Sequence, residues 1–428
     1  MHVAIVTAGG AGMFCGSCMQ DNTWARGLMV SGTPVTLIPT YTPIRVDESN
    51  HAQSRVFFGG VNVYLNARSR FWAALPGWTK SWLDQPWIIR QLTRFSISND
   101  ASELGELTLR MLEGEDGPLR EAGEELANYI GHELRPDIVV FSNALLSGCL
   151  PQVRREFAGP VACILQGDDI FLNGLPTSHR LPAIAAVSAR AQEFDGFLTH
   201  SWYYRDLMAN LLSLPPERFQ RIPLSIDLDP HIVSPFVSKE RPFTLGFFSR
   251  LAPEKGLHHL LDAFEIVARQ DSEIRLHVGG YLPVQHRRYY EAQLRRGAAF
   301  GERFRFCGSP NTIEDKVAFY RELDLFSVPA EYAEPKGIPV LEAWASGVPV
   351  VQPNTGAYPE LVGTDESGGL LVPPQNAELL AEAILRLKRD PAQHRRLAHA
   401  GATKVRDRHS HAVAAQVALT ALQQITRH

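Results

Sequence analysis

The chain of 428 residues is longer than one ordinary domain, so we expect two or three domains. Apolar residues make up 45% and charged residues 21%, a mixture that excludes a disordered chain and indicates a folded globular protein. The formal net charge of −4 disfavours a nucleic-acid-binding protein, which needs an excess of Lys and Arg. We therefore expect no nucleic-acid partner.

Compartment and membrane contact are predicted from the cysteines and the apolar runs. The five cysteines are Cys15, Cys18, Cys149, Cys163 and Cys307. An odd and sparse set in a long chain does not indicate a disulfide framework. The opening MHVAIVTAGG lacks the basic and apolar regions of a secretory signal, and no apolar run reaches the ~18 residues of a spanning helix. We expect a cytoplasmic protein, with peripheral contact at the inner membrane face left open.

The first half of the chain alternates strand and helix patterns. A short apolar run at 2–7 leads through a glycine-rich turn into a helical run at 19–31, and a second apolar run follows at 34–40. This order predicts a βαβ unit. Further apolar runs are PDIVVFS, GPVACILQ, GFLTHS and RFQRIPL. Short apolar strands separated by helices indicate a parallel sheet with helices on both faces.

The pattern then restarts in the second half. After a Pro-rich polar stretch come FTLGFFS, EIRLHVGG, RFRFCG, DLFSVP and VPVVQP, each followed by a turn and a helical run. The predicted fold class is therefore α/β, with two Rossmann-like doubly wound domains. We place the domains at 1–225 and 242–405, joined by a linker at 226–241. A terminal helix at 406–428 is expected to pack back onto the first domain.

One segment of the first half, residues 68–96, departs from this rhythm. It holds four of the seven tryptophans: Trp72, Trp78, Trp82 and Trp87. Arg and Lys are interleaved with them. Three interpretations stay open: helices that pack through aromatic faces, a wall of an acceptor site, and a patch that contacts a membrane surface.

Two cations follow the first strand of the second half. SRLAPEKG places Arg250 and Lys255 at the carboxyl end of FTLGFFS, on a loop that leads into a helix. Ligands of doubly wound sheets bind at that edge, and two cations there suit a diphosphate. The alternative is a solvated basic loop with a capping role.

Two carboxylates, Glu334 and Glu342, are separated by seven intervening residues further along the chain. Pro339 suits the first turn of a helix and Gly347 suits its end, so we predict a helix over 338–346. Glu334 then precedes the helix and Glu342 lies within it. The free N–H groups of the first turn favour an anion, and the carboxylates can accept hydrogen bonds from sugar hydroxyls.

These motifs resemble a known family. RLAPEKG and EPKGIPVLEAWASGVPVV are similar to the C-terminal domain of the retaining, nucleotide-sugar-dependent glycosyltransferases of the GT-B fold, family four, or group one. The family pattern is R-x4-K, then E-x7-E, then GG-PE, and this chain has all three in order, the last as TGAYPE. PLSIDLD resembles the family's NGID segment, and LHVGG resembles its AGDGP strand end.

The resemblance implies roles for the charged residues. Arg250 and Lys255 would bind the donor diphosphate, Glu342 would hold the ribose hydroxyls and Glu334 would contact the donor sugar. Arg250, Lys255 and Glu334 form the expected catalytic set. The family usually has an aromatic residue where this chain has Lys336, a third cation that would strengthen phosphate binding or meet an anionic sugar or acceptor. The alternative for this lysine is a solvated loop residue.

The resemblance also implies backbone contacts with the donor. The segment at 307–310 would frame the base, and the loop of TGAYPE would lie near the phosphate. The donor-binding residues expected for these reasons are Gly337, Ile338, Gly308, Ser309, Thr355 and Gly356.

The opening loop AGGAGMFCGSCMQDN is glycine-rich. It is not a dinucleotide fingerprint, because the third glycine of G-x-G-x-x-G would fall at Cys15 and no acidic residue ends the second strand. In the resembled family this loop lies near the donor phosphates, so Gly12 and Gly16 are our candidates for close backbone approach. Cys15 and Cys18 form a C-x-x-C pair, but nothing else supports a redox unit or a zinc site.

The acceptor-side candidates come from LQGDDIF. Many family members have a His where this chain has Gln166, and an amide cannot serve as a general base. Asp168 or Asp169 would contact the acceptor hydroxyl, with helix N-capping as the alternative. Asp227 and Asp229 spell D-x-D, but they match the segment that ends the family's first domain, so we predict no metal.

The expected function is sugar transfer from a nucleotide-diphosphate sugar to an acceptor hydroxyl with retained anomeric configuration. The nucleotide sugar is the co-substrate, and neither a further cofactor nor a metal is expected. The sequence does not identify the donor sugar, the base or the acceptor, and it does not indicate the oligomeric state. A sugar epimerase or phosphorylase of the same fold stays open as an alternative. An NAD-dependent oxidoreductase is disfavoured by the broken fingerprint.

Overall fold

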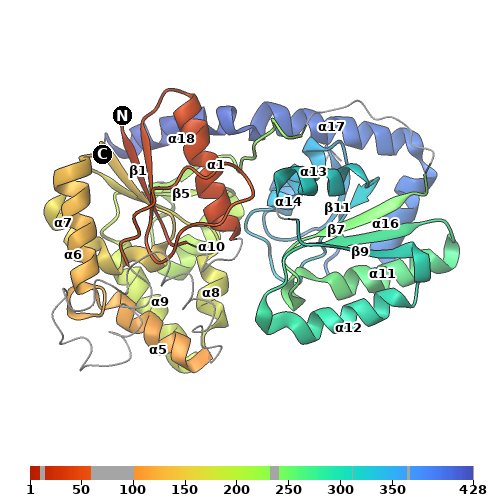
Figure 1. The fold of residues 1–428 in the computed structure, drawn as a ribbon, viewed down its shortest axis with the longest axis horizontal. Coiled ribbons are helices and arrows are strands. Elements are labelled where there is room, and N and C mark those ends of the chain that lie inside the picture. Colours follow the sequence, from red (N-terminus) through yellow and green to blue (C-terminus); the bar gives the residue numbers. More distant parts are fainter. Residues whose placement is uncertain (10–14, 59–100, 232–240, 311, 364–366, 428) are drawn as a thin grey trace. The chain divides into compact units, whose positions relative to one another are not determined.

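The computed structural model divides into two compact units, one formed by 1–222 with 414–428 and the other by 223–413. The structure describes residues 1–9, 15–58, 101–231, 241–310, 312–363 and 367–427 (Figure 1). Gly12 and the Trp-rich segment 68–96 therefore lie outside the described residues.

The first unit is built on a six-stranded parallel sheet of order β2-β1-β3-β4-β5-β6. The strands are β1 (Val3–Thr7), β2 (Val35–Pro39), β3 (Ile138–Phe141), β4 (Val161–Ile164), β5 (Gly196–Thr199) and β6 (Phe219–Arg221). β1, β3, β4 and β5 are buried along their whole length, because helices cover both faces of the sheet. All six strands fall on apolar runs predicted from the sequence.

Helices cover both faces of this first sheet. They are α1 (Gly16–Val30), α5 (Ala101–Leu112), α6 (Arg120–Asn128), α7 (Leu150–Glu156), α8 (Asp168–Gly174), α9 (Thr177–Ala191), α10 (Trp202–Leu212) and α18 (His411–Ile425). Apolar residues of α1 and α18 pack together on one face of the sheet. Residues of α5 to α10 form the core on the other face.

The second unit has its own six-stranded parallel sheet, of order β12-β11-β10-β7-β8-β9. The strands are β7 (Thr244–Phe248), β8 (Arg275–Gly279), β9 (Phe304–Gly308), β10 (Leu325–Phe326), β11 (Val350–Pro353) and β12 (Gly369–Val372). Counted within this unit, the order is that of a Rossmann sheet. β12 was not predicted, because GLLV is a short apolar run without the length or alternation that marks a strand.

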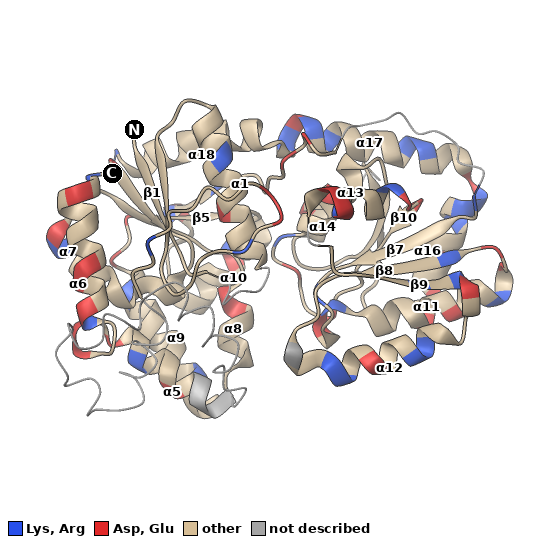
Figure 2. Cartoon of the chain, viewed as in Figure 1, with Lys and Arg blue, Asp and Glu red and all other residues tan. Residues whose placement is uncertain are grey.

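The helices of the second unit surround its sheet. They are α11 (Leu257–Gln270), α12 (Arg287–Ala298), α13 (Ile313–Arg321), α14 (Ile338–Ala345), α15 (Tyr358–Val362), α16 (Ala377–Arg389) and α17 (Pro391–His409). α14 confirms the helix predicted over 338–346. Lys and Arg are interspersed with Asp and Glu along α11 and α12 (Figure 2). The largest buried side chain of this unit is that of Trp344, whose Nε1 donates to the carbonyl of Gly368 at 2.8 Å.

Several short helical turns connect these elements. They span Gly114–Asp116, Tyr129–Leu134, Ala144–Cys149, Pro216–Arg218, Pro253–Lys255, Val284–His286 and Gly301–Arg303. Tyr129–Leu134 is a π turn, and the others are 3₁₀ turns.

The last helix begins later than the residue 406 expected from the sequence. α17 continues to His409, and Ser410 then takes an extended conformation and pairs with Ile226 as an isolated bridge. α18 begins at His411 and brings Ile425 against Gly196 of the first sheet, where a Cβ on the glycine would lie 2.8 Å from the Ile425 side chain. Among the described residues, no helix combines the length and the apolar character needed to cross a bilayer.

Candidate active site

The expected donor-site residues lie at the topological switch point of the second sheet. β7 and β10 are neighbours, while the strands that follow each of them extend to opposite sides of the sheet. Lys255 lies on the turn after β7, and Glu334 lies in the loop after β10. Ligands of open parallel sheets bind where the strand order reverses, at the carboxyl ends of the strands. The fold therefore brings two residues that are 79 positions apart to the expected ligand edge.

Lys255, Glu334 and Tyr332 form a hydrogen-bonded cluster at this point. The Lys255 ammonium lies 2.7 Å from Oε2 of Glu334 and also donates to the Tyr332 hydroxyl. The Tyr332 hydroxyl donates to the same Oε2 at 2.6 Å. An ammonium group has three N–H donors, so these two bonds leave one donor for another acceptor. The cluster can hold a cation ready for a phosphate oxygen.

The Glu334 carboxylate stays ionised in this cluster although it is buried. Burial by itself raises the pKa of Glu334, but the Lys255 charge and the hydrogen bonds from Lys255 and Tyr332 outweigh burial and hold the pKa below its usual range. The Lys336 charge acts in the same direction. Glu334 is therefore a hydrogen-bond acceptor, not a proton donor, near neutral pH.

Arg250 lies on the loop directly after β7 and is 45% exposed at its side chain. Its Nη2 donates to Oε1 of Glu254 at 2.5 Å, an i,i+4 ion pair within the loop. Exposed ion pairs of this kind are worth only ~0.2–1 kcal/mol, so the guanidinium can exchange its partner at little cost. This arrangement suits a residue that turns toward an anion when one binds.

The start of α14 is set by a glycine. Gly337 precedes the helix with φ 99°, in the left-handed region that favours glycine, and Ile338 is the first helical residue. The backbone N–H of Lys336 points at Oε1 of Glu334 at 3.4 Å. The loop before α14 thus holds the carboxylate, while the N–H of Ile338 belongs to the helix start that favours an anion.

The TGAYPE loop packs directly onto the Glu334 backbone. Gly356 has φ 63°, and a Cβ there would lie 2.5 Å from the Glu334 carbonyl oxygen. Ala357 donates its N–H to that same oxygen at 2.8 Å. Thr355, which precedes Gly356, is half-buried. The glycine is needed because no side chain fits between the two loops.

Glu342 is bound by two residues that the sequence did not indicate, Lys316 and Tyr320. It lies on α14, is 5% exposed, and pairs through Oε1 with the ammonium of Lys316 at 2.6 Å. Oε2 accepts from the Tyr320 hydroxyl at 2.8 Å. Lys316 is only 1% exposed. In the sequence IEDKVAFYR a lysine has the pattern of a solvated helix position, so no local signal indicates this buried pair.

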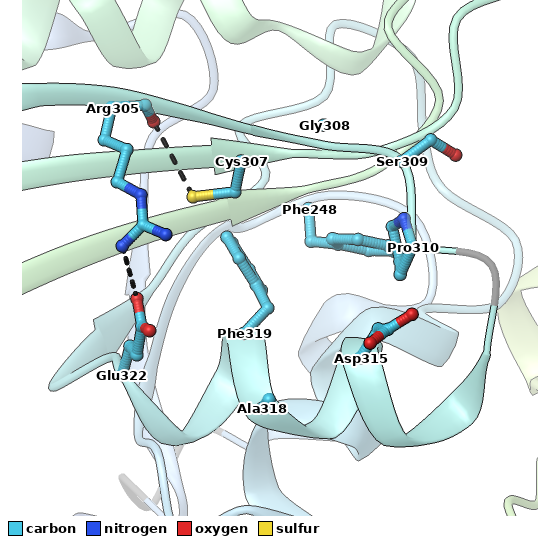
Figure 3. Close-up of a pocket in the computed structure, with 10 residues that line it drawn as sticks. All are labelled: Phe248, Arg305, Cys307, Gly308, Ser309, Pro310, Asp315, Ala318, Phe319 and Glu322. Carbon is cyan, nitrogen blue, oxygen red and sulfur yellow. Dashed lines mark hydrogen bonds and ion pairs between the residues drawn. The ribbon is translucent and has the colours of Figure 1, made fainter.

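A pocket opens beside the end of β9. It has a volume of about 300 Å³, at the lower end of the ~300–1,000 Å³ typical of small-molecule sites. Gly308 and Ser309, the residues expected to frame the base, line it. Figure 3 shows the rings of Phe248 and Phe319 between β9 and α13, with centroids 5.4 Å apart. Aromatic faces of this kind can stack on a planar base.

In the first unit, the Gln166 side chain is hydrogen-bonded to Asp21, a buried aspartate that the sequence did not indicate. The Gln166 amide nitrogen donates to Oδ1 of Asp21 at 2.8 Å and to the Ser142 carbonyl at 3.1 Å. Thr7 donates to Oδ2 of Asp21 at 2.7 Å. Asp21 is fully buried on α1, where three strand ends meet. Gln166 therefore positions Asp21.

The two aspartates after Gln166 are also engaged within the protein. Asp168 accepts from the N–H of Ala144 at 2.7 Å and from the N–H of Gln166 at 2.9 Å. Asp169 accepts from the Tyr204 hydroxyl at 2.7 Å. Asp168 and Asp169 are the first two residues of α8, whose N-cap residue is Gly167. Asp168 joins the loops that follow β3 and β4.

The start of α1 carries the remaining expectations for the opening loop. Gly16, the first residue of α1, is exposed, and a Cβ there would meet nothing within 4 Å. Nothing within the described protein therefore requires a glycine at this position. A hydrogen bond with Cys15 and burial raise the pKa of Cys18 well above its usual range, which opposes a reactive thiolate.

The D-x-D residues form a local turn. Oδ1 of Asp227 accepts from the N–H of Asp229 at 3.1 Å, and His411 lies 3.5 Å from the same oxygen. Asp227 is buried. The turn lies near the start of the second unit.

The buried carboxyl of Asp21 predicts a pH-dependent stability. Burial raises its pKa to about 7, whereas an Asp in an unfolded chain titrates near ~3.9. Between these values the folded protein binds a proton that the unfolded chain releases, so the free energy of unfolding falls as pH rises from about 4 to about 7. Asp21→Asn is expected to remove this part of the fall and to gain stability relative to the wild type above pH 7.

Chemical unfolding of both proteins over this pH range measures the difference. The wild-type curve also contains Asp168, whose pKa burial raises to about 6, so only the comparison isolates Asp21. Asp206→Asn, on the exposed face of α10, is the matched control and should leave the curve unchanged. Parallel curves for wild type and Asp21→Asn would contradict the prediction.

The family model and the similar curated proteins match less than half of this chain. Residues 231–404 match the family model described as glycosyl transferases group 1. The phosphatidyl-myo-inositol mannosyltransferase of Mycobacterium leprae is 33% identical over 168 residues, 39% of this chain and 42% of that protein. The capsular polysaccharide biosynthesis glycosyltransferase CapM of Staphylococcus aureus is 25% identical over 174 residues, again 39% and 42%. The match thus spans less than half the length of these curated relatives.

Solved structures match over the whole chain. The sucrose-phosphate synthase of Thermosynechococcus elongatus aligns with a TM-score of 0.71 and 19% identity, covering 100% of both chains. Anabaena Alr3699/HepE in complex with UDP aligns with a TM-score of 0.67 and 16% identity, covering 99% of this chain and 100% of that one. At such identities the likeness shows the fold alone, and the alignments extend over both units.

Proposed function

We propose that this chain transfers a hexose from a nucleoside-diphosphate sugar to an acceptor hydroxyl with retained anomeric configuration. The chain belongs to the glycosyl transferases group 1 family through residues 231–404 and has the GT-B fold. The observation that carries the proposal is the Lys255–Glu334–Tyr332 cluster at the switch point of the second sheet. It combines a cation for a diphosphate with an ionised acceptor for sugar hydroxyls.

The nucleotide is proposed to lie along the carboxyl edge of the second sheet. The base enters the pocket at Gly308 and Ser309, and the ribose hydroxyls donate to lone pairs that Glu342 has left beyond its bonds to Lys316 and Tyr320. Lys316 fixes the direction of those lone pairs, so it is a positioning residue.

The diphosphate is the leaving group of the proposed reaction. The bond between the anomeric carbon and the phosphate oxygen breaks through an oxocarbenium-like transition state, and the acceptor oxygen bonds to the same face of the sugar. The departing phosphate takes the proton of the acceptor hydroxyl. Lys255, Arg250 and the start of α14 stabilise the negative charge that develops on it. A protein general base is not required, which agrees with the hydrogen bonds that Gln166 and Asp168 make to other groups of the protein.

The hexose is proposed from the charged cluster together with the activity of a similar protein. Glu334 offers one carboxylate for paired sugar hydroxyls, and the similar protein of Mycobacterium leprae is a mannosyltransferase. Lys336 beside it supplies a further positive charge near the sugar site.

An acceptor-dependent assay tests the proposed reaction. Calorimetry with a panel of nucleoside-diphosphate hexoses selects the donor, and release of nucleoside diphosphate is then followed with and without candidate hydroxyl acceptors. A transferase releases the diphosphate in step with a glycosylated product, whose anomeric configuration by NMR equals that of the donor. An epimerase or phosphorylase would convert the sugar without that product, and an inverted product would contradict retention.

A further inference from the structure

Two histidines and a glutamate outside the proposed donor-binding set converge on one point of the second unit. His258 and His259 lie in the first turn of α11, and Glu331 lies in the loop after β10. Nε2 of His258 is 2.9 Å and Nε2 of His259 is 3.2 Å from the same Oε1 of Glu331. One nitrogen or oxygen from each residue lies within 4.8 Å of the others.

The backbone holds these residues in place. Glu331 donates its N–H to the Glu254 carbonyl at 3.0 Å, which ties the loop after β10 to the turn before α11. The two imidazole rings are 4.1 Å apart between centroids. Both histidine side chains are largely buried, at 24% and 20% exposure, while Glu331 is 39% exposed. The cluster is thus fixed at its base and open to solvent at one side.

Each histidine has a further group on its other ring nitrogen. Nδ1 of His258 is 2.9 Å from the Tyr289 hydroxyl, and Nδ1 of His259 is 4.0 Å from Oδ2 of Asp262. Metal-binding histidines typically direct their second ring nitrogen to such an oxygen, which fixes the ring and the tautomer.

We propose that His258, His259 and Glu331 bind a divalent transition-metal ion of the zinc type. Two imidazoles and one carboxylate are a ligand set that zinc accepts, with water completing a tetrahedron. Ligand atoms of such a tetrahedron lie ~3.3 Å apart at bond lengths of ~2.0 Å. The 2.9 and 3.2 Å separations are close to that edge length. On binding, the ring proton of His258 lies on Nδ1 and is donated to the Tyr289 oxygen.

The proposed metal acts on the position of a loop and takes no part in the transfer reaction. Glu331 precedes Tyr332 directly and Glu334 by three residues, while His258 follows Lys255 by three residues. A metal bound to both segments would link the turn that carries Lys255 to the loop that carries Glu334. It would hold these two residues at their observed separation before the donor binds.

Metal binding to the full chain, without donor, tests the proposal. Protein treated with EDTA and then dialysed is titrated with Zn²⁺ by calorimetry, and with Co²⁺ by visible absorption, in which four-coordinate Co²⁺ gives a distinctive spectrum. We expect one ion bound per chain. Affinity should fall more than ~100-fold in His259→Gln and Glu331→Gln, since the loss of an outer partner alone costs ~10–100-fold. Tyr289→Phe should show that smaller loss.

His399→Gln is the matched control, because His399 is an exposed histidine of α17 outside the cluster. It should bind the ion as the wild type does. Equal affinity in wild type, His259→Gln and Glu331→Gln would overturn the proposal, as would a Co²⁺ spectrum of the hexahydrated type. Because no donor is present, either outcome leaves the proposed transferase activity to be judged by its own assay.

Discussion

Replacing Lys255 with alanine is expected to lower kcat/KM for the nucleotide-sugar donor by about 100- to 1,000-fold, the loss typical of one charge-stabilising group. The Lys255 ammonium lies 2.7 Å from Glu334, and its removal takes positive charge away from the leaving diphosphate. Initial rates at varied donor concentration, with calorimetry of nucleoside-diphosphate binding, measure the effect.

Lys388→Ala is the matched control for this change. Lys388 is also ion-paired, with Asp271 at the opposite end of α11, and has a similar exposure of 19% against 15% for Lys255. Its loss removes a cation from the same unit but not from the ligand edge, so turnover should stay unchanged. Unaltered donor affinity in Lys255→Ala would remove the basis of the proposed site.

Replacing Lys316 with methionine is expected to destabilise the second unit by about 3–5 kcal/mol. Lys316 is 1% exposed and is paired with Glu342, so the substitution leaves a buried carboxylate without this counter-charge. The hydrogen bond from the Tyr320 hydroxyl to that carboxylate remains. Calorimetric unfolding of wild type and variant measures the loss, with the two units allowed to unfold separately.

The double variant Lys316→Met with Glu342→Gln distinguishes the ion pair from simple packing. It removes both charges, so it should recover most of the stability lost in Lys316→Met, and a double-mutant cycle gives the coupling. Donor affinity should nevertheless stay low in the double variant, because the ribose acceptor is lost. If the double variant were as unstable as the sum of the single changes, Lys316 would not act through Glu342.

Local patterns predicted the strands and the ends of α14 because these depend on near neighbours. Pro339 in the first turn and Gly347 just beyond the helix define α14, and the apolar runs of β1 and β7 each stand before a glycine-rich or polar turn. β12 was missed because four residues are too few to show a period. The late start of α18 depends on the pairing of Ser410 with Ile226, a contact across the sequence.

The sequence by itself determined which residue types follow which strand, and hence that Arg250, Lys255 and Glu334 lie at one sheet edge. That follows from strand direction, since parallel strands end on the same side. Only the tertiary structure decided the partners: Lys316 under Glu342, Gln166 on Asp21, and two histidines on Glu331. The reason is physical. A buried charge is tolerated only when an opposite charge or a hydrogen-bond donor lies beside it. In these cases the partner comes from a segment far away in the sequence, so a local sequence pattern cannot predict it.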